Sequence, residues 1–85
     1  MHKLPTSSGR VVIAVLERLG FRKVRQRGSH VVLKRISLSS TDVCVVPLHR
    51  EVAMGTLRGV MRQANVTIEE FLTALTDKMG KQAKG

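Results

Sequence analysis

The amino-acid sequence predicts an α+β fold in which one helix precedes three antiparallel strands and two further helices follow. Apolar residues recur at helical spacing near the start of the chain and twice near its end. Between them lie β-rich or alternating segments, joined by links too short for the crossover that parallel strands need. A three-stranded sheet has two faces, so the simplest packing places the helices on one face and leaves the other open.

The first helix is expected over about residues 8–19. Ser7 or Ser8 can cap its start, because a side-chain oxygen there accepts a hydrogen bond from the first turn. Gly20 can adopt the left-handed conformation that often follows a helix. The expected buried stripe, at the spacing i, i+3, i+4 and i+7, is Val12, Val15, Leu16 and Leu19.

Three short segments are expected to form the strands. A tight turn at Arg27-Gly28 joins the first two, which must therefore be antiparallel. Pro47 is expected to close the third strand, because proline cannot donate a ladder hydrogen bond. The expected strands cover residues 21–26, 29–36 and 43–46, with a polar link over 37–42 and a loop over 48–53.

Two helices are expected after this loop. Asn65 can end the first in the left-handed conformation, and Thr67 with Glu70 forms a capping box at the start of the second. The Lys-rich segment from Gly80 onward is expected to fray. The apolar stripes are Leu57, Val60, Met61 and Ala64 in the first helix, and Ile68, Phe71, Leu72 and Leu75 in the second.

Length and charge narrow the classes of partner. The 85 residues are expected to form one domain, with an ordered core over about residues 7–78 and a basic tail over 79–85. Lys and Arg number 15 against 6 Asp and Glu, which gives a net charge of +9 and favours a phosphate-rich or acidic partner. The chain has no Trp or Tyr, and both Phe fit core positions. Any nucleic acid would therefore be held through its backbone and shape, since base stacking needs exposed aromatic side chains.

Cysteine usage and hydropathy favour a cytoplasmic location. The single Cys44 excludes an intramolecular disulfide and a cysteine-based zinc site, and it is expected to pack as a small apolar residue. No apolar run approaches the ~20 residues that span a bilayer, and the N-terminus lacks the apolar segment of a signal peptide. An anionic membrane is therefore a less favoured partner for the positive charge than a nucleic acid or an acidic protein.

The segment Gly28-Ser29-His30 leads from the turn into the second strand. Side chains alternate along a strand, so His30 is expected to share a face with Val32 and Lys34. A histidine on a firm support beside positive charge can transfer protons in a reaction of a polyanion. A strand histidine without any such role is the commoner case. The opposite face is expected to carry Ser29, Val31, Leu33 and Arg35.

Several motifs along the chain occur together in one known family. They are Ser8-Gly9, Leu19-Gly20-Phe21, Arg25-Gln26-Arg27-Gly28-Ser29-His30, Val46-Pro47-Leu48-His49, Gly55-Thr56-Leu57-Arg58 and Arg62-Gln63-Ala64. In this order, over roughly residues 7–75, the chain resembles HicA, a family of small toxins of bacterial and archaeal toxin–antitoxin pairs. The resemblance implies a double-stranded-RNA-binding-like fold and ribosome-independent cleavage of mRNA. It also implies a HicB-type antitoxin that covers the active face.

The resemblance further implies that His30 is catalytic, since the family's Gly-Ser-His histidine has that role. Metal-free RNA cleavage needs one group to take the proton of the ribose 2′-OH and one to protonate the leaving 5′-oxygen. His49 is a candidate for the second step, and a structural role in its loop is the alternative. The candidate RNA-binding residues are Arg25, Arg27, Ser29, Lys34 and Arg58, with a solvated surface or a turn role as their alternative.

No cofactor or metal is expected, because the six carboxylates are scattered and mostly helical, unlike the cluster that holds two Mg²⁺ ions. The expected partners are mRNA and the antitoxin, with no membrane, and the chain alone is expected to be a monomer or small oligomer. Two other functions fit the same basic surface. One is a non-catalytic RNA- or DNA-binding module, since phosphate contacts alone give affinity. The other is an interaction domain for an acidic protein.

Overall fold

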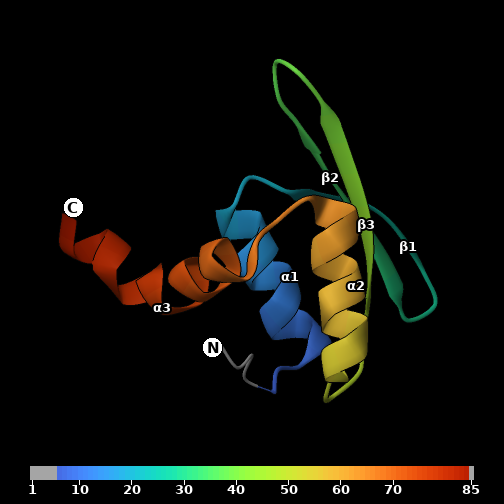
Figure 1. Ribbon diagram of the computed structural model, residues 1–85. Coiled ribbons are helices and arrows are strands. Elements are labelled where there is room, and N and C mark those ends of the chain that lie inside the picture. Colours follow the sequence, from blue (N-terminus) through green and yellow to red (C-terminus); the bar gives the residue numbers. More distant parts are fainter. Residues whose placement is uncertain (1–5, 85) are drawn as a thin grey trace.

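The computed structural model describes residues 6–84, and the side chains of residues 6–77. One helix, an antiparallel sheet in the order β1-β2-β3 and two helices follow one another (Figure 1), which confirms the predicted α+β fold. The elements are α1 (Gly9–Arg18), β1 (Arg22–Arg27), β2 (His30–Ile36), β3 (Thr41–Pro47), α2 (Met54–Ala64) and α3 (Ile68–Lys84).

The helices begin and end at the predicted signals. The Ser8 hydroxyl accepts a hydrogen bond from the Val11 N–H at 3.2 Å. Gly20 has a φ of +100°, and Asn65 is left-handed with a φ of 60°. At the start of α3 the capping box forms in both directions, because Glu70 N–H donates to Thr67 Oγ1 and Thr67 N–H donates to Glu70 Oε1. Helix α3 continues through Gly80 to Lys84, beyond the expected fraying point. The side chains of the basic tail over 79–85 lie outside the described residues.

The hydrophobic core lies between the helices and one face of the sheet. The three helices stand on one side of the sheet (Figure 1). The predicted stripes of α1 and α2 are buried, with Leu19 partly so, and in α3 Phe71 is fully buried while Ile68, Leu72 and Leu75 pack partly buried against the core. On the sheet, the buried residues are Val31 and Leu33 of β2 and Cys44, Val46 and Pro47 of β3. The predicted alternation of β2 is therefore confirmed, and His30 lies on the face away from the core.

The strand ends differ from the predicted ones for identifiable reasons. Phe21 belongs to the end of α1, because its N–H donates to the Leu16 carbonyl, and β1 starts at Arg22. Strand β3 includes Pro47, which the sequence placed just after the strand. Leu48 N–H points back to the Ser29 carbonyl of the hairpin. The backbone nitrogen of the adjacent Pro47 therefore points to the outer edge of β3. The missing N–H of this proline removes no hydrogen bond between β2 and β3.

Strand β3 also begins earlier than predicted, at Thr41 rather than Val43. Asp42 is half-buried and pairs in register with Arg35 of β2, with which it forms an ion pair. This cross-strand pair holds an aspartate in a strand, where aspartate is usually disfavoured. The outer edge of β3 is covered by α2, where Gln63 Oε1 accepts a hydrogen bond from Val45 N–H at 3.2 Å.

Candidate functional site

The turn between β1 and β2 sets the position of His30. Gly28 has a φ of +59° and Ser29 does not have a positive φ, the pattern of a hairpin turn with glycine at its first central position. Gln26 Nε2 donates a hydrogen bond to the Gly28 carbonyl at 3.0 Å. His30 is the first residue of β2, and its side chain is exposed. The imidazole therefore stands at the start of a paired strand with solvent access.

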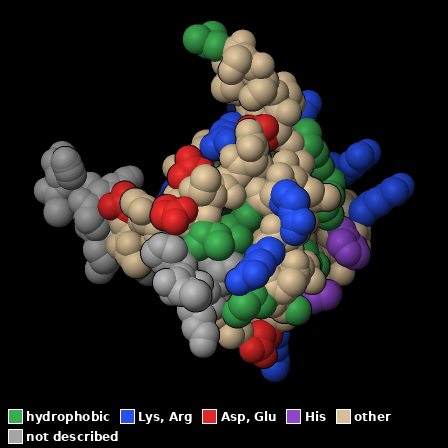
Figure 2. All heavy atoms as spheres, in the orientation of Figure 1, with side chains coloured by type: hydrophobic (Ala, Val, Ile, Leu, Met, Phe, Trp, Pro, Cys, Tyr) green, Lys and Arg blue, Asp and Glu red, His purple; other side chains and the backbone are tan. Residues whose placement is uncertain are grey.

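The chain after β3 lies against this turn. Leu48 N–H donates to the Ser29 carbonyl at 2.6 Å, and Gly9 N–H donates to the His49 carbonyl at 2.9 Å. His49 is exposed. Figure 2 shows the two described histidines, in purple, on one face of the molecule. The structure therefore brings the segment of His49 beside the turn of His30.

The start of α1 depends on the absence of a side chain at position 9. A Cβ on Gly9 would overlap the Pro47 carbonyl oxygen and lie 2.9 Å from Leu48 Cα. The backbone continues this contact upstream, where Val52 N–H donates to the Ser7 carbonyl at 2.7 Å. Gly9 thus lets α1 approach the segment that carries His49 closely enough to bond to it.

Cations surround His30 on the open face of the sheet. Arg27 pairs with His30 and Arg25 pairs with Val32 across β1 and β2. Directly opposed residues of antiparallel strands project to the same face, and Lys34 shares that face by alternation along β2. The structure therefore brings three of the predicted RNA-binding side chains to the face of His30. Among the side chains of residues 6–77, these three cations have no hydrogen-bond or ion-pair partner.

The sequence did not predict a fourth cation on this face. Strict alternation back from Arg25 places Lys23 on the open face, but a bulge between these two residues shifts the register. Arg22 consequently lies opposite Lys34, and Lys23 turns to the helix side. No residue type in this basic strand marks the bulge, so periodicity alone could not have found Arg22.

The two remaining predicted RNA contacts are placed differently. Ser29 is exposed in the turn, directly before His30. Arg58 is exposed on α2, which flanks the outer edge of β3. Within the described part of the chain, no hydrogen bond or ion pair joins Arg58 to the sheet face of His30. Ser29 is therefore near His30, and Arg58 belongs to a separate surface element.

Arg35 has a structural role. Its guanidinium bonds to Asp42 Oδ2 at 3.0 and 3.3 Å and to the Leu19 carbonyl at 3.1 Å. A longer bond of 3.5 Å reaches the Ala64 carbonyl, and the guanidinium carbon lies 4.6 Å from the centre of the Phe21 ring. Arg35 therefore ties the ends of α1 and α2 to the sheet.

Cys44 is buried in the core, as predicted. Burial raises the pKa of its thiol to about 11, an effect that the nearby Arg35 charge partly opposes. The thiol is therefore neutral near pH 7 and is not an activated nucleophile. Within residues 6–77, His, Cys, Asp and Glu form no cluster of three that could hold a metal ion.

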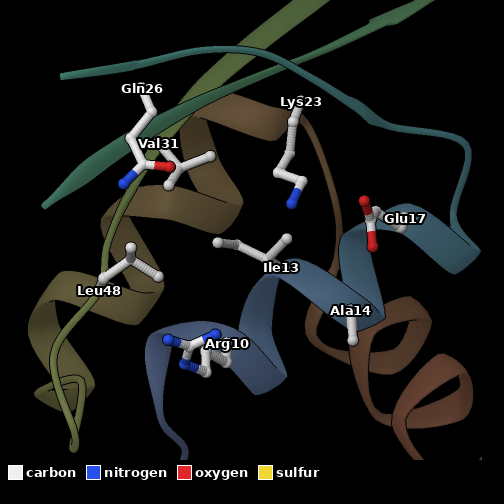
Figure 3. A pocket seen from close by; sticks show the side chains of 8 residues that line it. All are labelled: Arg10, Ile13, Ala14, Glu17, Lys23, Gln26, Val31 and Leu48. Atoms are coloured by element: carbon white, nitrogen blue, oxygen red, sulfur yellow. The ribbon is translucent and has the colours of Figure 1, made fainter.

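A cleft of about 290 Å³ lies on the other side of the β1–β2 hairpin, next to α1. Figure 3 shows Lys23 and Gln26 reaching into it from the sheet and Arg10 and Glu17 lining it from α1. Val31 belongs to its wall, and Val31 projects to the face opposite His30. The cleft is therefore separate from the histidine face, and the candidate site is the open sheet surface.

The family of the chain follows from a match to a known family model. Residues 9–66 match the family model described as HicA toxin of bacterial toxin-antitoxin. The chain belongs to the HicA toxin family. The matched range contains both described histidines and all four cations of the open face. Neither the curated proteins nor the solved structures gave a match. Across the described residues, no helix is both long and apolar enough to cross a membrane.

Proposed function

We propose that this HicA family toxin is an endoribonuclease that cleaves mRNA without a metal ion, with His30 as a proton-transfer group. The proposal rests on the residues that surround His30. The imidazole is exposed on a sheet face where Arg25, Arg27 and Lys34 have no anionic partner among the described side chains. Such a surface attracts a polyanion and presents to it an imidazole, the side chain that most often serves as a general acid or base.

The reaction that fits is attack by the ribose 2′-oxygen on the adjacent phosphorus. The bond from phosphorus to the 2′-oxygen forms while the bond to the 5′-oxygen breaks, which leaves a 2′,3′-cyclic phosphate and a 5′-hydroxyl. One group takes the 2′-OH proton and another donates a proton to the leaving 5′-oxygen. His30 performs one of these steps, and the nearby cations stabilise the added negative charge on the phosphoryl oxygens.

His49 is the candidate for the other proton transfer. Its support is positional, because the hydrogen bonds of Leu48 to Ser29 and of Gly9 to His49 hold its segment beside the turn of His30. Under this proposal His49→Ala removes one limb of the pH–rate profile of cleavage. A His49 that is only structural would leave the shape of the profile unchanged and lower the stability instead.

The remaining residues bind and position RNA. Arg25 and Arg27 contact phosphates near the reaction centre, Lys34 contacts a phosphate farther along the strand, and Ser29 orients the nucleotide at the turn. Arg58 on α2 provides a contact outside the sheet. These are backbone contacts, so they supply affinity with little base preference.

The partner that controls this activity is a HicB-type antitoxin that covers the open face. The exposed cations and the uncovered side chains of His30 and Val43 support this choice, because an acidic protein surface placed there would block access to His30. The toxin and antitoxin act in the cytoplasm, where mRNA is accessible.

The reaction class is tested with the native protein, excess chelator and two labelled strands of identical base order, one RNA and one entirely 2′-deoxy. We expect cleavage of the RNA, cyclic phosphate ends and an intact deoxy strand, because only RNA carries the attacking hydroxyl. Binding of both strands without cleavage would favour a non-catalytic nucleic-acid-binding module. Cleavage that requires an added divalent ion would contradict the metal-free proposal.

A further inference from the structure

We infer that Arg22 and Lys34 form a second phosphate-binding site, so that single-stranded RNA runs along β1 away from His30. The inference rests on the proposed function, because it takes His30 as the place where the RNA backbone is cut. It assigns Arg22 a role that the sequence pattern did not indicate.

The register of the sheet defines this site. Lys34 lies four residues beyond His30 on β2, which places it roughly 13 Å away at about 3.3 Å per residue. Arg22 is directly opposite Lys34 on β1, so both side chains project to the face of His30. Two cations therefore meet at the far end of the open face.

The cations between the two ends form a continuous row. Arg27 pairs with His30, Arg25 with Val32 and Arg22 with Lys34. All three arginines are exposed, and no carboxylate lies between residues 18 and 41. Like charges in a row repel one another unless an anion lies along them. A polynucleotide backbone, which carries one charge per nucleotide, has the required form.

RNA is favoured over an acidic protein because the row begins at the proposed reaction centre. An RNA strand with one phosphate at His30 must continue over some part of the protein surface. The arginines of β1 provide a positively charged path for its next phosphates. The chain has no Trp or Tyr, and Phe21 and Phe71 are buried, so base stacking does not provide another path on the described surface.

Lys23 provides a matched control. It is the neighbour of Arg22 on the same strand and carries the same charge, but it pairs with Leu33 and lines the cleft beside Glu17. Removing either side chain changes the net charge by the same amount. The register places the side chain of Arg22 on the face of His30 and that of Lys23 on the helix side, although Lys23 also borders the hollow between Arg22 and Lys34.

The test measures the affinity of RNA in a His30→Ala background, so that the strand stays intact, with excess chelator throughout. The two probes are a dinucleotide, which is too short to reach Arg22, and a fluorescent single strand of about eight nucleotides. Arg22→Ala should weaken binding of the longer strand several-fold more than that of the dinucleotide. It should also reduce the slope of log affinity against log salt by about 0.7, the value for one lost phosphate contact on a single strand.

Lys23→Ala should change the affinity for either probe by less than about twofold, and Arg22→Lys should restore most of the lost affinity. Equal losses for Arg22→Ala and Lys23→Ala would overturn the inference, because the effect would then be one of net charge. Unchanged RNA binding by Arg22→Ala, with weaker binding to the antitoxin, would also overturn it and assign the row to the protein partner. Failure of the native protein to cleave RNA would contradict the proposed function alone, because this comparison measures binding.

Discussion

Neighbouring residues of β2 have opposite roles because the strand alternates. Lys34 points to the open face, whereas Arg35 points inward and bonds to Asp42 and to carbonyls at the ends of α1 and α2. Alternation along the strand was enough to predict that His30 and Lys34 share one face and that Arg35 lies on the other. It could not predict the partners of Arg35, because these come from three separate elements that only the tertiary fold brings together.

Arg35→Ala is expected to lower the free energy of unfolding by roughly 2 kcal/mol, since it leaves a half-buried carboxylate and two helix-end carbonyls without their donor. The matched variant Lys34→Ala removes a neighbouring cation that has no partner within residues 6–77. Its expected effect is less than about 0.5 kcal/mol. Urea unfolding of both variants measures the difference, and equal losses would show that Arg35 is not the tie between helices and sheet.

At the scale of elements, local signals predicted where helices begin and end but not the details of the sheet. The hydroxyl of Ser8 and the left-handed Asn65 act within a single turn of chain, so the sequence contains the whole cause. The bulge before Arg25 and the inclusion of Pro47 in β3 depend on what the neighbouring strand and helix present. The sequence therefore predicted the order of the elements and the face of His30, but it did not predict Arg22.

The contact between α1 and the chain after β3 predicts opposite effects for two glycine variants. Gly9→Ala should lower the free energy of unfolding by about 1–3 kcal/mol, because its methyl group would overlap the Pro47 carbonyl and displace the segment of His49. Gly59→Ala, in the interior of α2 with no atom within 4 Å of the added methyl, should raise it by about 0.5–1 kcal/mol. Urea unfolding measures both effects, and a neutral Gly9→Ala would contradict the close approach described here.

Across the whole molecule, charge is separated by element. The β1–β2 hairpin carries six Lys and Arg over residues 22–35 and no carboxylate, whereas three of the six acids, Glu69, Glu70 and Asp77, lie on α3. In Figure 2, blue side chains project from the sheet and α2, and red side chains lie over α3 and also at the upper and lower ends of the view. The hairpin that carries His30 therefore holds six of the 15 basic residues of the chain and none of its six acidic ones. This distribution steers a polyanion to the open face, and the net charge alone could not have predicted that direction.

The most direct test of the central claim is the initial rate of RNA cleavage in excess chelator by the native protein and by His30→Ala. The side chain of His30 is exposed, so the variant should fold and still bind RNA, which circular dichroism and a binding titration verify. We expect its cleavage rate to fall by at least about a hundredfold, the usual effect of removing a proton-transfer group. Equal rates for the two proteins would contradict the assignment of the chemistry to His30.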